Sequence, residues 1–489
     1  MTRKGEEKEF VKELTPKSVD FSQWYVDVIR KTDMADYTTI KGCMVIKPYG
    51  YAIWENIKSA LDRRIKATGH QNAYFPLFVP ESLLKLEAEH VKGFAPEVAW
   101  VTHGGDEPLE ERLAIRPTSE AIICSIYARW VQSYRDLPIL INQWANIVRW
   151  EKVTRLFLRT TEFLWQEGHT CHRTYEEAQE ETLRMLGVYK EFVETELALP
   201  VICGEKTESE KFAGAQKTYC IEALMADGKS LQAGTSHNLG QHFARVFGIK
   251  FLDEDQTEKY VWQTSWGVST RLIGGVVMAH GDDSGLVLPP RIAPIQLIFV
   301  PIYTTATQSA ICEKVNSLNS QILQSSNSQI RSELDFRDTY TPGWKFNEWE
   351  MKGVPLRAEV GPKDIQKKQV VLVRRDTHEK IFVPEDDLTE KVVTLLSEIQ
   401  EGIYSKALAF REEHTTRTDR FEEFKEVLET KKGFIISGWC GSPECEEKVK
   451  EETKATIRCI PSEGNNQVEG YCVACGKPAQ KKAYFARSY

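Results

Sequence analysis

Two stretches decide the fold of this chain: Val148-Arg-Trp-Glu151, and Phe157-Leu-Arg-Thr-Thr-Glu-Phe-Leu-Trp-Gln-Glu-Gly-His169. Both are rich in strand-forming residues, and a polar, arginine-bearing connection joins them, which predicts an antiparallel hairpin. Successive side chains of a strand point to opposite faces. Trp165, Glu167 and His169 therefore share one face, and we expect them to converge on a pocket.

The residues around this hairpin predict a mixed domain of helices and strands. Further β-type runs occupy 139–150 and 264–278, and a strand is expected at 73–79. Amphipathic helices are predicted at 51–68 and 175–197. The apolar face of the second helix would carry Leu183, Leu186, Tyr189, Val193 and Leu197. Because helices and strands come in blocks without regular β-α-β alternation, we expect an antiparallel α+β domain.

Turn-forming residues at 282–290 mark a domain boundary. Beyond it the pattern predicts a small α/β domain, with strands at 296–301, 330–336, 356–360 and 370–373 and helices at 307–324, 343–352 and from 387 onward. The last helix leads into a third domain that holds a cysteine cluster. We therefore predict domains at 1–290, 291–402 and 403–489.

Length and composition exclude several classes of protein. The 489 residues are 41% hydrophobic and 27% charged, which is ordinary for a globular protein. No apolar run approaches the roughly 18–20 residues of a membrane span, and no secretory signal is visible, so a cytoplasmic protein is expected. The net charge of −8 argues against a chain coated with basic charge, although a local basic face is compatible with it.

The cysteines near the C-terminus predict a zinc site. Cys440 and Cys445 form one close pair, and Cys472 and Cys475 form another. Two such pairs can place four thiolates tetrahedrally around one ion, and a saturated four-sulfur site is structural rather than catalytic. Cys459 lies between the pairs and is expected to be buried instead.

Two other motifs resemble ligand sites, but their residues do not fit that interpretation. Two histidines and a cysteine at 169–172 look like a metal cluster, but adjacent residues of a strand alternate faces. The run Asp227-Gly-Lys-Ser230 ends like a phosphate loop, yet residue 223 is alanine where that loop needs glycine. A bound nucleotide would therefore be held by side chains.

The hairpin carries side chains that could bind a nucleotide. Arg149 can hold a phosphate or carboxylate bidentately. Glu151 and Arg159 could serve an adenine end, although an ordinary ion pair across the hairpin is the plainer interpretation.

Taken together with other motifs of the sequence, the hairpin residues make the chain resemble the class II prolyl-tRNA synthetases. The resemblance is to the archaeal and eukaryotic-like type, which has a C-terminal zinc domain. The resemblance covers nearly the whole chain. The second type of prolyl-tRNA synthetase, found in bacteria, carries an inserted editing domain, and no insertion of that length separates Glu167 from Gln232 here. The resemblance is carried by Arg116-Pro-Thr-Ser-Glu120, the two hairpin stretches, Leu231-Gln-Ala-Gly-Thr-Ser-His237, Ser265-Trp-Gly-Val-Ser-Thr-Arg271, His280-Gly-Asp282, Gly285-Leu-Val-Leu-Pro-Pro-Arg291, Thr341-Pro-Gly-Trp-Lys-Phe-Asn-Glu-Trp-Glu350 and Gly361-Pro-Lys-Asp364.

The resemblance implies ATP-dependent activation of proline, its transfer to the 3′ end of tRNA(Pro), and specific residues for each substrate. Arg149 and Arg271 would be catalytic, with Arg291 a weaker alternative to Arg271. The proline-binding residues would be Thr118, Glu120, Arg149, Trp165, Glu167, His169 and His237. The ATP-binding residues would be Arg149, Glu151, Arg159, Thr160, Gln232, Thr235, Ser269 and Arg271, with Mg²⁺ accompanying ATP.

It also implies partners beyond the small substrates. The helix 51–68 and a strand ending at Pro76 would form the interface of a homodimer. The 291–402 domain would bind the tRNA anticodon, with the candidate contacts Lys345, Glu348, Glu350, Arg357 and Lys363. The terminal Tyr489 would fold back toward the catalytic domain and place its carboxylate near the active site.

Two other functions are compatible with parts of this pattern. One is a paralogue that makes an aminoacyl-adenylate for another acceptor, and the other is a regulatory RNA-binding protein with a dead active site. An apparently complete anticodon-like domain argues against the first. Intact Arg149, Glu151 and Arg271 argue against the second.

Overall fold

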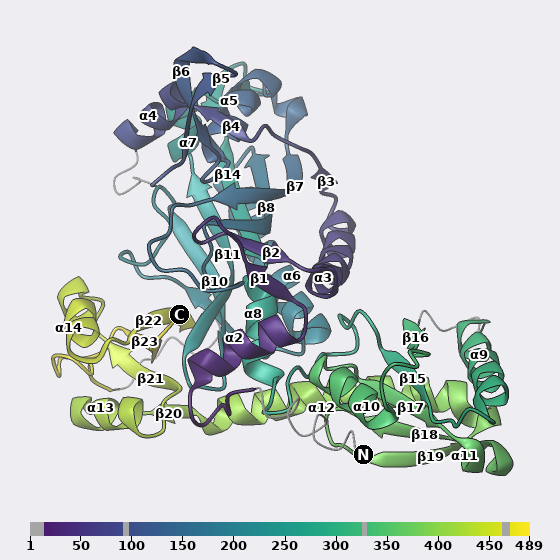
Figure 1. Cartoon of the computed structure of the whole chain (residues 1–489). Helices are drawn as coiled ribbons and strands as arrows, with labels where there is room; N and C mark the ends of the chain where they lie inside the picture. Colours follow the sequence, from purple (N-terminus) through teal and green to yellow (C-terminus); the bar gives the residue numbers. More distant parts are fainter. Residues whose placement is uncertain (1–13, 91–96, 325–329, 462–469) are drawn as a thin grey trace.

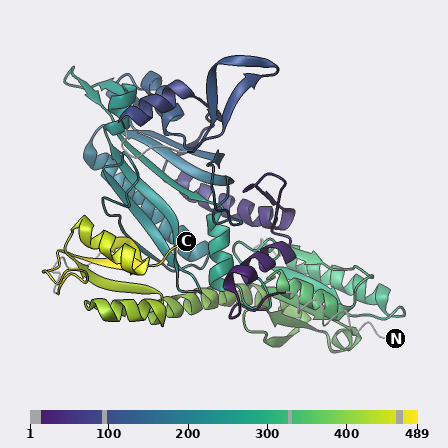
Figure 2. The same ribbon diagram turned by 60° about the vertical axis from the view of Figure 1, so that its left-hand side comes forward.

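The computed structural model describes residues 14–90, 97–324, 330–461 and 470–489. We name three successive regions by their elements (Figure 1). The N-terminal region runs from α2 (Phe21–Lys31) to α8 (Arg271–His280), the middle region from β15 (Leu297–Pro301) to β19 (Lys380–Pro384), and the C-terminal region from β20 (Thr415–Arg417) to β23 (Lys481–Ala486). The long helix α12 (Leu388–Glu413) joins the last two and runs along the base of the molecule (Figures 1 and 2).

The N-terminal region is built on an antiparallel sheet, as predicted. Its strands β7 and β8 form the expected hairpin, with Ile147 opposite Phe163. The other neighbours are antiparallel as well, except that β3 pairs parallel with β7 at the sheet edge. In spatial order the strands are β3 (Gln71–Asn72), β7 (Ile139–Val148), β8 (Glu162–His172), β14 (Trp262–Ser269), β11 (Ser230–Gly240), β10 (Lys217–Leu224) and β9 (Val201–Glu205).

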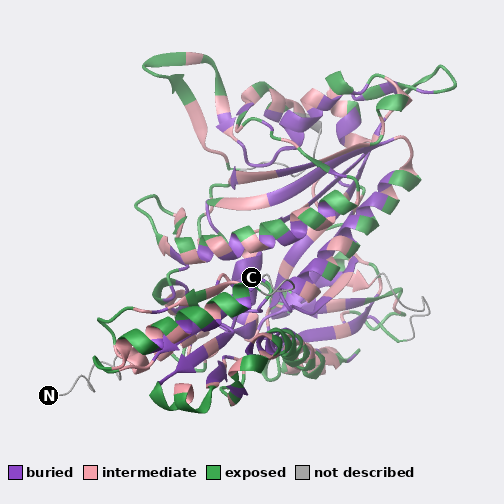
Figure 3. Cartoon of the chain, turned by 90° about the vertical axis from the view of Figure 1, so that its right-hand side faces the viewer, coloured by how far each residue is buried: buried purple, intermediate pink, exposed green. Residues whose placement is uncertain are grey.

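Helices α3 (Pro48–Ala67), α6 (Tyr175–Glu196) and α8 cover one face of this sheet. Thr174 caps α6 by accepting a hydrogen bond from the backbone N–H of Glu177, which satisfies one of the free amides of its first turn. The predicted apolar face of α6 is largely buried, but Leu183 is exposed. The core under α6 includes Met185, Tyr189, Phe192, Val193, Ile221, Trp266 and Val268, and Figure 3 shows burial concentrated in the strands and the inner helix faces.

Two predicted strands differ in the structure. The segment 73–79 is not a continuous strand, because the side chain of Gln143 takes the Phe75 N–H at 2.5 Å in place of a ladder bond. The run 264–278 is a strand only to Ser269 and then becomes helix α8. A Cβ on Gly274 would lie 2.6 Å from the Leu158 side chain, so glycine lets this helix approach its neighbour closely.

Smaller elements surround the sheet. A loop occupies 149–161 of the hairpin, where Phe157 has a positive φ of 60°. The remaining elements are β1 (Ala35–Tyr37), β2 (Met44–Ile46), β4 (Phe78–Pro80), α4 (Glu81–His90), β5 (Trp100–Gly104), β6 (Glu107–Ile115), α5 (Glu120–Trp130), the 3-10 turn η1 (Tyr134–Asp136), α7 (His242–Phe247), β12 (Lys250–Leu252) and β13 (Glu258–Tyr260). Within the described ranges, every helix is too short or too polar to cross a bilayer.

The middle region is the predicted small α/β unit. Its sheet has the order β16-β15-β17-β18-β19, with β15 parallel to both neighbours and the last two pairings antiparallel. Helix α11 and strand β19 were not predicted, and β16 is shorter than expected. The elements between β15 and α12 are α9 (Gln308–Gln324), β16 (Ser332–Leu334), α10 (Pro342–Met351), β17 (Leu356–Val360), α11 (Pro362–Lys367), β18 (Gln369–Arg374), β19 and η2 (Glu385–Asp387).

The C-terminal region extends the large sheet rather than standing apart from it. Its strand β22 pairs with β9 of the N-terminal region, with Ile460 opposite Glu205. Among the described residues the combined sheet therefore has eleven strands, in the order β20-β21-β23-β22-β9-β10-β11-β14-β8-β7-β3. The remaining elements are α13 (Phe421–Glu429), β21 (Phe434–Trp439), α14 (Pro443–Thr453) and β22 (Thr456–Pro461).

Candidate functional site: a pocket on the large sheet

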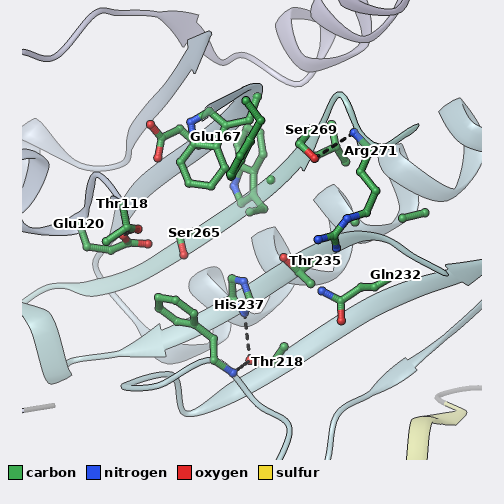
Figure 4. A pocket seen from close by; sticks show the side chains of 18 of the residues that line it. Thr118, Glu120, Glu167, Thr218, Gln232, Thr235, His237, Ser265, Ser269 and Arg271 are labelled. Carbon is green, nitrogen blue, oxygen red and sulfur yellow. Dashed lines mark hydrogen bonds between the residues drawn. The ribbon is translucent and has the colours of Figure 1, made fainter. Parts of the chain in front are cut away.

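A cavity of approximately 320 Å³ opens on strands β8, β10, β11 and β14. Eleven of the predicted proline- and ATP-binding residues line it: Thr118, Glu120, Arg149, Trp165, Glu167, His169, Gln232, Thr235, His237, Ser269 and Arg271. Figure 4 labels all of them except Arg149, Trp165 and His169. Antiparallel pairing explains this gathering, because alternate residues of β8, β11 and β14 face the same side. Ser265 of β14, for example, lies opposite both His169 and His237.

The Glu167 carboxylate is the most heavily hydrogen-bonded group of the pocket. It accepts from Ser119 Oγ at 2.5 Å, from Gln143 Nε2 at 2.7 Å and from His169 Nε2 at 2.9 Å. Burial alone would raise the pKa of Glu167, but the hydrogen bond and charge of His169 and the two other donors hold it below its ordinary value. Burial likewise would lower the pKa of His169, and Glu167 outweighs it, so the pKa of His169 is raised. The two side chains form a buried ion pair.

A second carboxylate stands at the start of α5. Glu120 is 4% exposed and accepts a short hydrogen bond from Thr118, which is also 4% exposed. Arg116 fixes the chain just before them, since it is fully buried and donates to the backbone carbonyls of Phe75 and Asn146. This end of the pocket therefore presents a buried negative group to a cation.

Two arginines supply the opposite charge. Arg149 donates from Nε to the Pro117 carbonyl at 3.0 Å, and Arg271, the first residue of α8, donates from Nε to the Leu158 carbonyl at 3.2 Å. Burial and the nearby positive charge of Arg149 lower the pKa of Arg271. Among the described residues, neither guanidinium has a carboxylate within ion-pairing distance. The pair is thus arranged to receive an anion from outside the chain.

His237 is held as a neutral group. Burial, followed by the charge of His169, lowers its pKa to about 3. Its Nδ1 lies 3.0 Å from Thr218 Oγ1, and its ring packs 4.8 Å from that of Phe212. The imidazole can therefore form hydrogen bonds in the pocket without adding charge.

Three predicted ATP-binding residues lie beside the pocket rather than in its lining. Glu151 and Arg159 form an ion pair at 3.0 Å in the hairpin loop. This is the ordinary ion pair across the hairpin that the sequence also allowed. Thr160 is 5% exposed and donates to the Glu162 carbonyl. The alternative arginine, Arg291, approaches Glu196 at 3.6 Å and does not line the pocket.

Other lining residues escaped the sequence analysis. They include Phe163, Glu210, Phe212, Thr218 and Ser265. Thr218 and Ser265 could have been found by strand alternation, since each lies opposite His237 in the sheet. Glu210 and Phe212 belong to the irregular connection between β9 and β10, and no sequence periodicity places such residues.

The four predicted zinc ligands come together in the C-terminal region. The sulfur atoms of Cys440, Cys445, Cys472 and Cys475 all lie within 4.8 Å of one another. Cys440 Sγ is 3.6 Å from Cys445 Sγ and 3.8 Å from Cys475 Sγ. A tetrahedral site with Zn–S bonds of about 2.3 Å needs sulfurs about 3.8 Å apart, so the donor set fits zinc. Cys459 is buried in β22 and does not belong to this group.

Comparison with known proteins identifies the family. Family models match residues 421–489 (prolyl-tRNA synthetase, C-terminal), 100–280 (tRNA synthetase class II core domain for G, H, P, S and T) and 296–395 (anticodon binding domain). The chain is 61% identical to the proline–tRNA ligase of Natranaerobius thermophilus, covering 98% of this chain and 99% of that protein. It is 59% identical to the proline–tRNA ligase of Alkaliphilus oremlandii, covering 99% of each.

A solved structure of a prolyl-tRNA synthetase has the same fold as this chain. The prolyl-tRNA synthetase of Cryptosporidium parvum, crystallised with halofuginone and AMPPNP, is 44% identical over 98% of this chain and 99% of that one, with a TM-score of 0.91. The chain belongs to the prolyl-tRNA synthetase family. This synthetase is a class II enzyme that ligates proline to tRNA, with the predicted class II core and anticodon-binding domain. Each matched range falls inside one predicted domain, although α12 runs unbroken across residues 402 and 403.

The candidate anticodon contacts of the synthetase lie on α10, β17 and α11 of the middle region. Lys363 is exposed, and the Glu350 side chain is 26% exposed. Glu348 is engaged by Arg337 at 2.5 Å, and Arg357 donates to Glu359.

Lys345 must be removed from the candidate tRNA contacts. It is 2% exposed, and its ammonium donates to the Asp335 carbonyl at 3.0 Å. An ammonium buried and paired in this way stabilises the domain and leaves no charge for a phosphate. The sequence showed a lysine on a predicted helix, but not the side on which it would lie.

The tail of the synthetase docks against the N-terminal region, as expected. The Tyr489 hydroxyl donates to Asp227 at 2.7 Å, and its backbone N–H donates to the Ser230 carbonyl at 3.2 Å. Its ring also lies 5.8 Å from the guanidinium of Arg155 in the hairpin loop. A catalytic part for its carboxylate stays a prediction.

Proposed function

We propose that the pocket binds proline at its carboxylate end and ATP at its arginine end, and joins them at Arg149. The observation that carries this proposal is the separation of charge within one cavity. Buried Glu120 lies at one end of the pocket and Arg271 at the other (Figure 4), and among the described residues neither Arg149 nor Arg271 has a carboxylate within ion-pairing distance.

Proline fits the first side chemically. Its secondary ammonium would meet Glu120 and Thr118, since a carboxylate and a hydroxyl are the acceptors that such a cation needs. Trp165 offers an apolar face to the pyrrolidine ring, with Glu167, His169 and neutral His237 around it. The proline carboxylate would then point to Arg149.

ATP fits the second side. Arg149 would hold the α-phosphate, and Arg271, Ser269, Gln232 and Thr235 would hold the remaining nucleotide. Glu151, Arg159 and Thr160 adjoin this end in the hairpin loop, from which they would contact adenine and the γ-phosphate. The Cryptosporidium parvum structure contains AMPPNP, an ATP analogue, which supports a nucleotide site in this fold.

The chemistry is then charge neutralisation and positioning. A carboxylate oxygen of proline attacks the α-phosphorus of ATP, a new O–P bond forms, and the bond to the β-phosphate oxygen breaks to release pyrophosphate. Both reactants are anionic, so Arg149 and Arg271 lower the barrier by offsetting their charge. A terminal hydroxyl of tRNA next attacks the prolyl carbonyl and releases AMP. Mg²⁺ bound to the phosphates would supply further neutralisation.

The other parts of the chain support the same function. The cysteine group would hold one structural zinc ion, helix α3 would form a homodimer interface, and the middle region would bind the anticodon of tRNA(Pro) through Glu348, Glu350, Arg357 and Lys363. The predicted domains at 1–290, 291–402 and 403–489 would carry these three roles. Cytoplasmic location, where translation takes place, is part of the proposal.

Proline-dependent exchange of pyrophosphate into ATP, measured beside the charging of tRNA(Pro), tests the proposal. We expect both activities, with Glu120→Gln raising the KM for proline and Arg271→Ala raising the KM for ATP. Exchange without charging would favour the paralogue that uses another acceptor. Absence of both would favour the RNA-binding protein with a dead site.

A further inference from the structure

A buried ion cluster joins the C-terminal region to the large sheet beside the pocket. Glu222 of β10 is fully buried, and Lys206 and Arg458 beside it are 5% and 6% exposed. Arg458 of β22 donates to both carboxylate oxygens, at 2.9 and 3.2 Å. Lys206 donates to Oε1 at 2.9 Å, and Ser230 donates from Oγ to Oε2 at 2.6 Å. Every oxygen of Glu222 is therefore engaged.

The cluster lies next to the end of the pocket assigned to ATP. Glu222 is directly opposite Gln232 in the pairing of β10 with β11, and Gln232 stands beside Arg271 (Figure 4). Ser230 begins β11 two residues before Gln232. Ser230 is also held by the C-terminal tail, since its N–H donates to the Arg487 carbonyl and its carbonyl accepts from Tyr489.

Electrostatics connects the cluster to Arg271. Burial would raise the pKa of Glu222, but the charges of Lys206 and Arg458 outweigh burial and hold it below its ordinary value, so the carboxylate is ionised. That negative charge opposes the lowering of the Arg271 pKa. Glu222 is thus a potential competitor of the ATP phosphates for this guanidinium.

We propose that Arg458 is a positioning residue for the ATP site, supplied by the C-terminal region to keep the Glu222 carboxylate engaged. With both oxygens of Glu222 occupied, the start of β11 is fixed and Arg271 is left free for ATP. Without Arg458, Lys206 still reaches Oε1 and Ser230 still reaches Oε2, but each oxygen loses one donor. Among the described residues of the cluster, Lys206 is then the one cation left to offset the Glu222 charge, so the attraction of this carboxylate for Arg271 grows. The inference rests on the proposed placement of ATP at Arg271.

The test measures KM values for ATP and for proline in pyrophosphate exchange by the full-length protein. Arg458→Met should raise the KM for ATP about tenfold, the scale of one lost contact to a charged group, and leave the KM for proline within about twofold. Adding Glu222→Gln should restore the KM for ATP toward the wild-type value, because a neutral amide does not compete for Arg271. A purely structural role would give no such restoration.

Matched variants make the outcome unambiguous. Arg411→Met removes another arginine that crosses to the N-terminal region, where it donates to the Val201 carbonyl, and should change neither KM. If Arg458→Met does not fold, Arg458→Lys keeps the charge with fewer donors and should raise the KM for ATP by a smaller factor. Equal rises in both KM values, or no restoration by Glu222→Gln, would overturn the inference.

The placement of ATP is tested separately by Arg271→Ala. An unchanged KM for ATP in that variant would overturn both the proposed ATP site and this inference. A raised KM in Arg271→Ala with no change in Arg458→Met would overturn the inference alone.

Discussion

Replacement of Glu167 by glutamine tests the buried network under the proline site. The carboxylate accepts three hydrogen bonds, from Ser119, Gln143 and His169, at 2.5 to 2.9 Å. A glutamine oxygen can still accept from Ser119 and Gln143. Its NH₂ group would face His169 Nε2, which must then be unprotonated to accept, so the ion pair is lost.

The size of the effect follows from this count. A hydrogen bond to a charged group is worth about 1.5–3 kcal/mol and one between neutral groups about 1 kcal/mol. Weakening three charged bonds to neutral ones therefore costs about 1.5–6 kcal/mol, or roughly a tenfold or greater loss in kcat/KM for proline. Ser119→Ala removes one hydrogen bond to the charged carboxylate, worth about 1.5–3 kcal/mol, and leaves the pair of Glu167 with His169 in place.

The pH dependence has a definite sign. The raised pKa of His169 means that its contribution is fully present below the ordinary value of 6.5 and is lost as pH rises through the raised pKa. The lowered pKa of Glu167 means that its contribution is present above the ordinary value of 4.5 and is lost as pH falls through the lowered pKa. Proline binding should weaken on the alkaline side in the wild type, and Glu167→Gln should lack that limb because its His169 is already neutral.

Pyrophosphate exchange at varied proline and pH provides the assay, with ATP saturating. A Glu167→Gln enzyme within about threefold of the wild type, well below the expected loss, would refute the ion-pair interpretation. The interpretation would also be refuted if proline binding weakened identically at high pH in the wild type and in Glu167→Gln.

Three further outcomes are expected. Arg149→Ala or Arg271→Ala should reduce prolyl-adenylate formation by about 10²-fold or more with the fold intact, and activation near the wild-type rate would remove that arginine from the mechanism. Metal analysis should find about one zinc per chain, lost in Cys440→Ser or Cys472→Ser and kept in Cys459→Ser; full zinc in either ligand variant contradicts the site. Sedimentation at micromolar concentration should show a homodimer, and a monomer would count against the assignment of α3 to an interface.

Much of the pocket was predictable because it is built on strands. Trp165, Glu167 and His169 were placed together by alternation along β8, and the structure puts all three in the cavity lining. The cysteine group was equally accessible, because its ligands come in two close pairs. In both cases a local spacing determines a local geometry.

The errors have a common physical cause. The run after Ser269 looked like a strand because valine and isoleucine favour strands, yet close packing of Gly274 against Leu158 accommodates a helix there. Lys345 looked like a free cation, but Asp335 lies close in space and neutralises it. Each outcome depends on a neighbour distant in sequence, which composition and periodicity do not report.

The pairing of β22 with β9 also depends on residues distant in sequence, in this case residues of two different predicted domains. The sequence places a boundary near residue 403, and the cysteine cluster suggests a separate module beyond it. In the structure that module completes the large sheet, places Arg458 on Glu222 and holds Ser230 from both sides. A strand edge left at β9 and a buried carboxylate left without Arg458 would both be costly. The C-terminal region is therefore part of the structure that supports the pocket, and the boundary near residue 403 does not separate independent units at this joint.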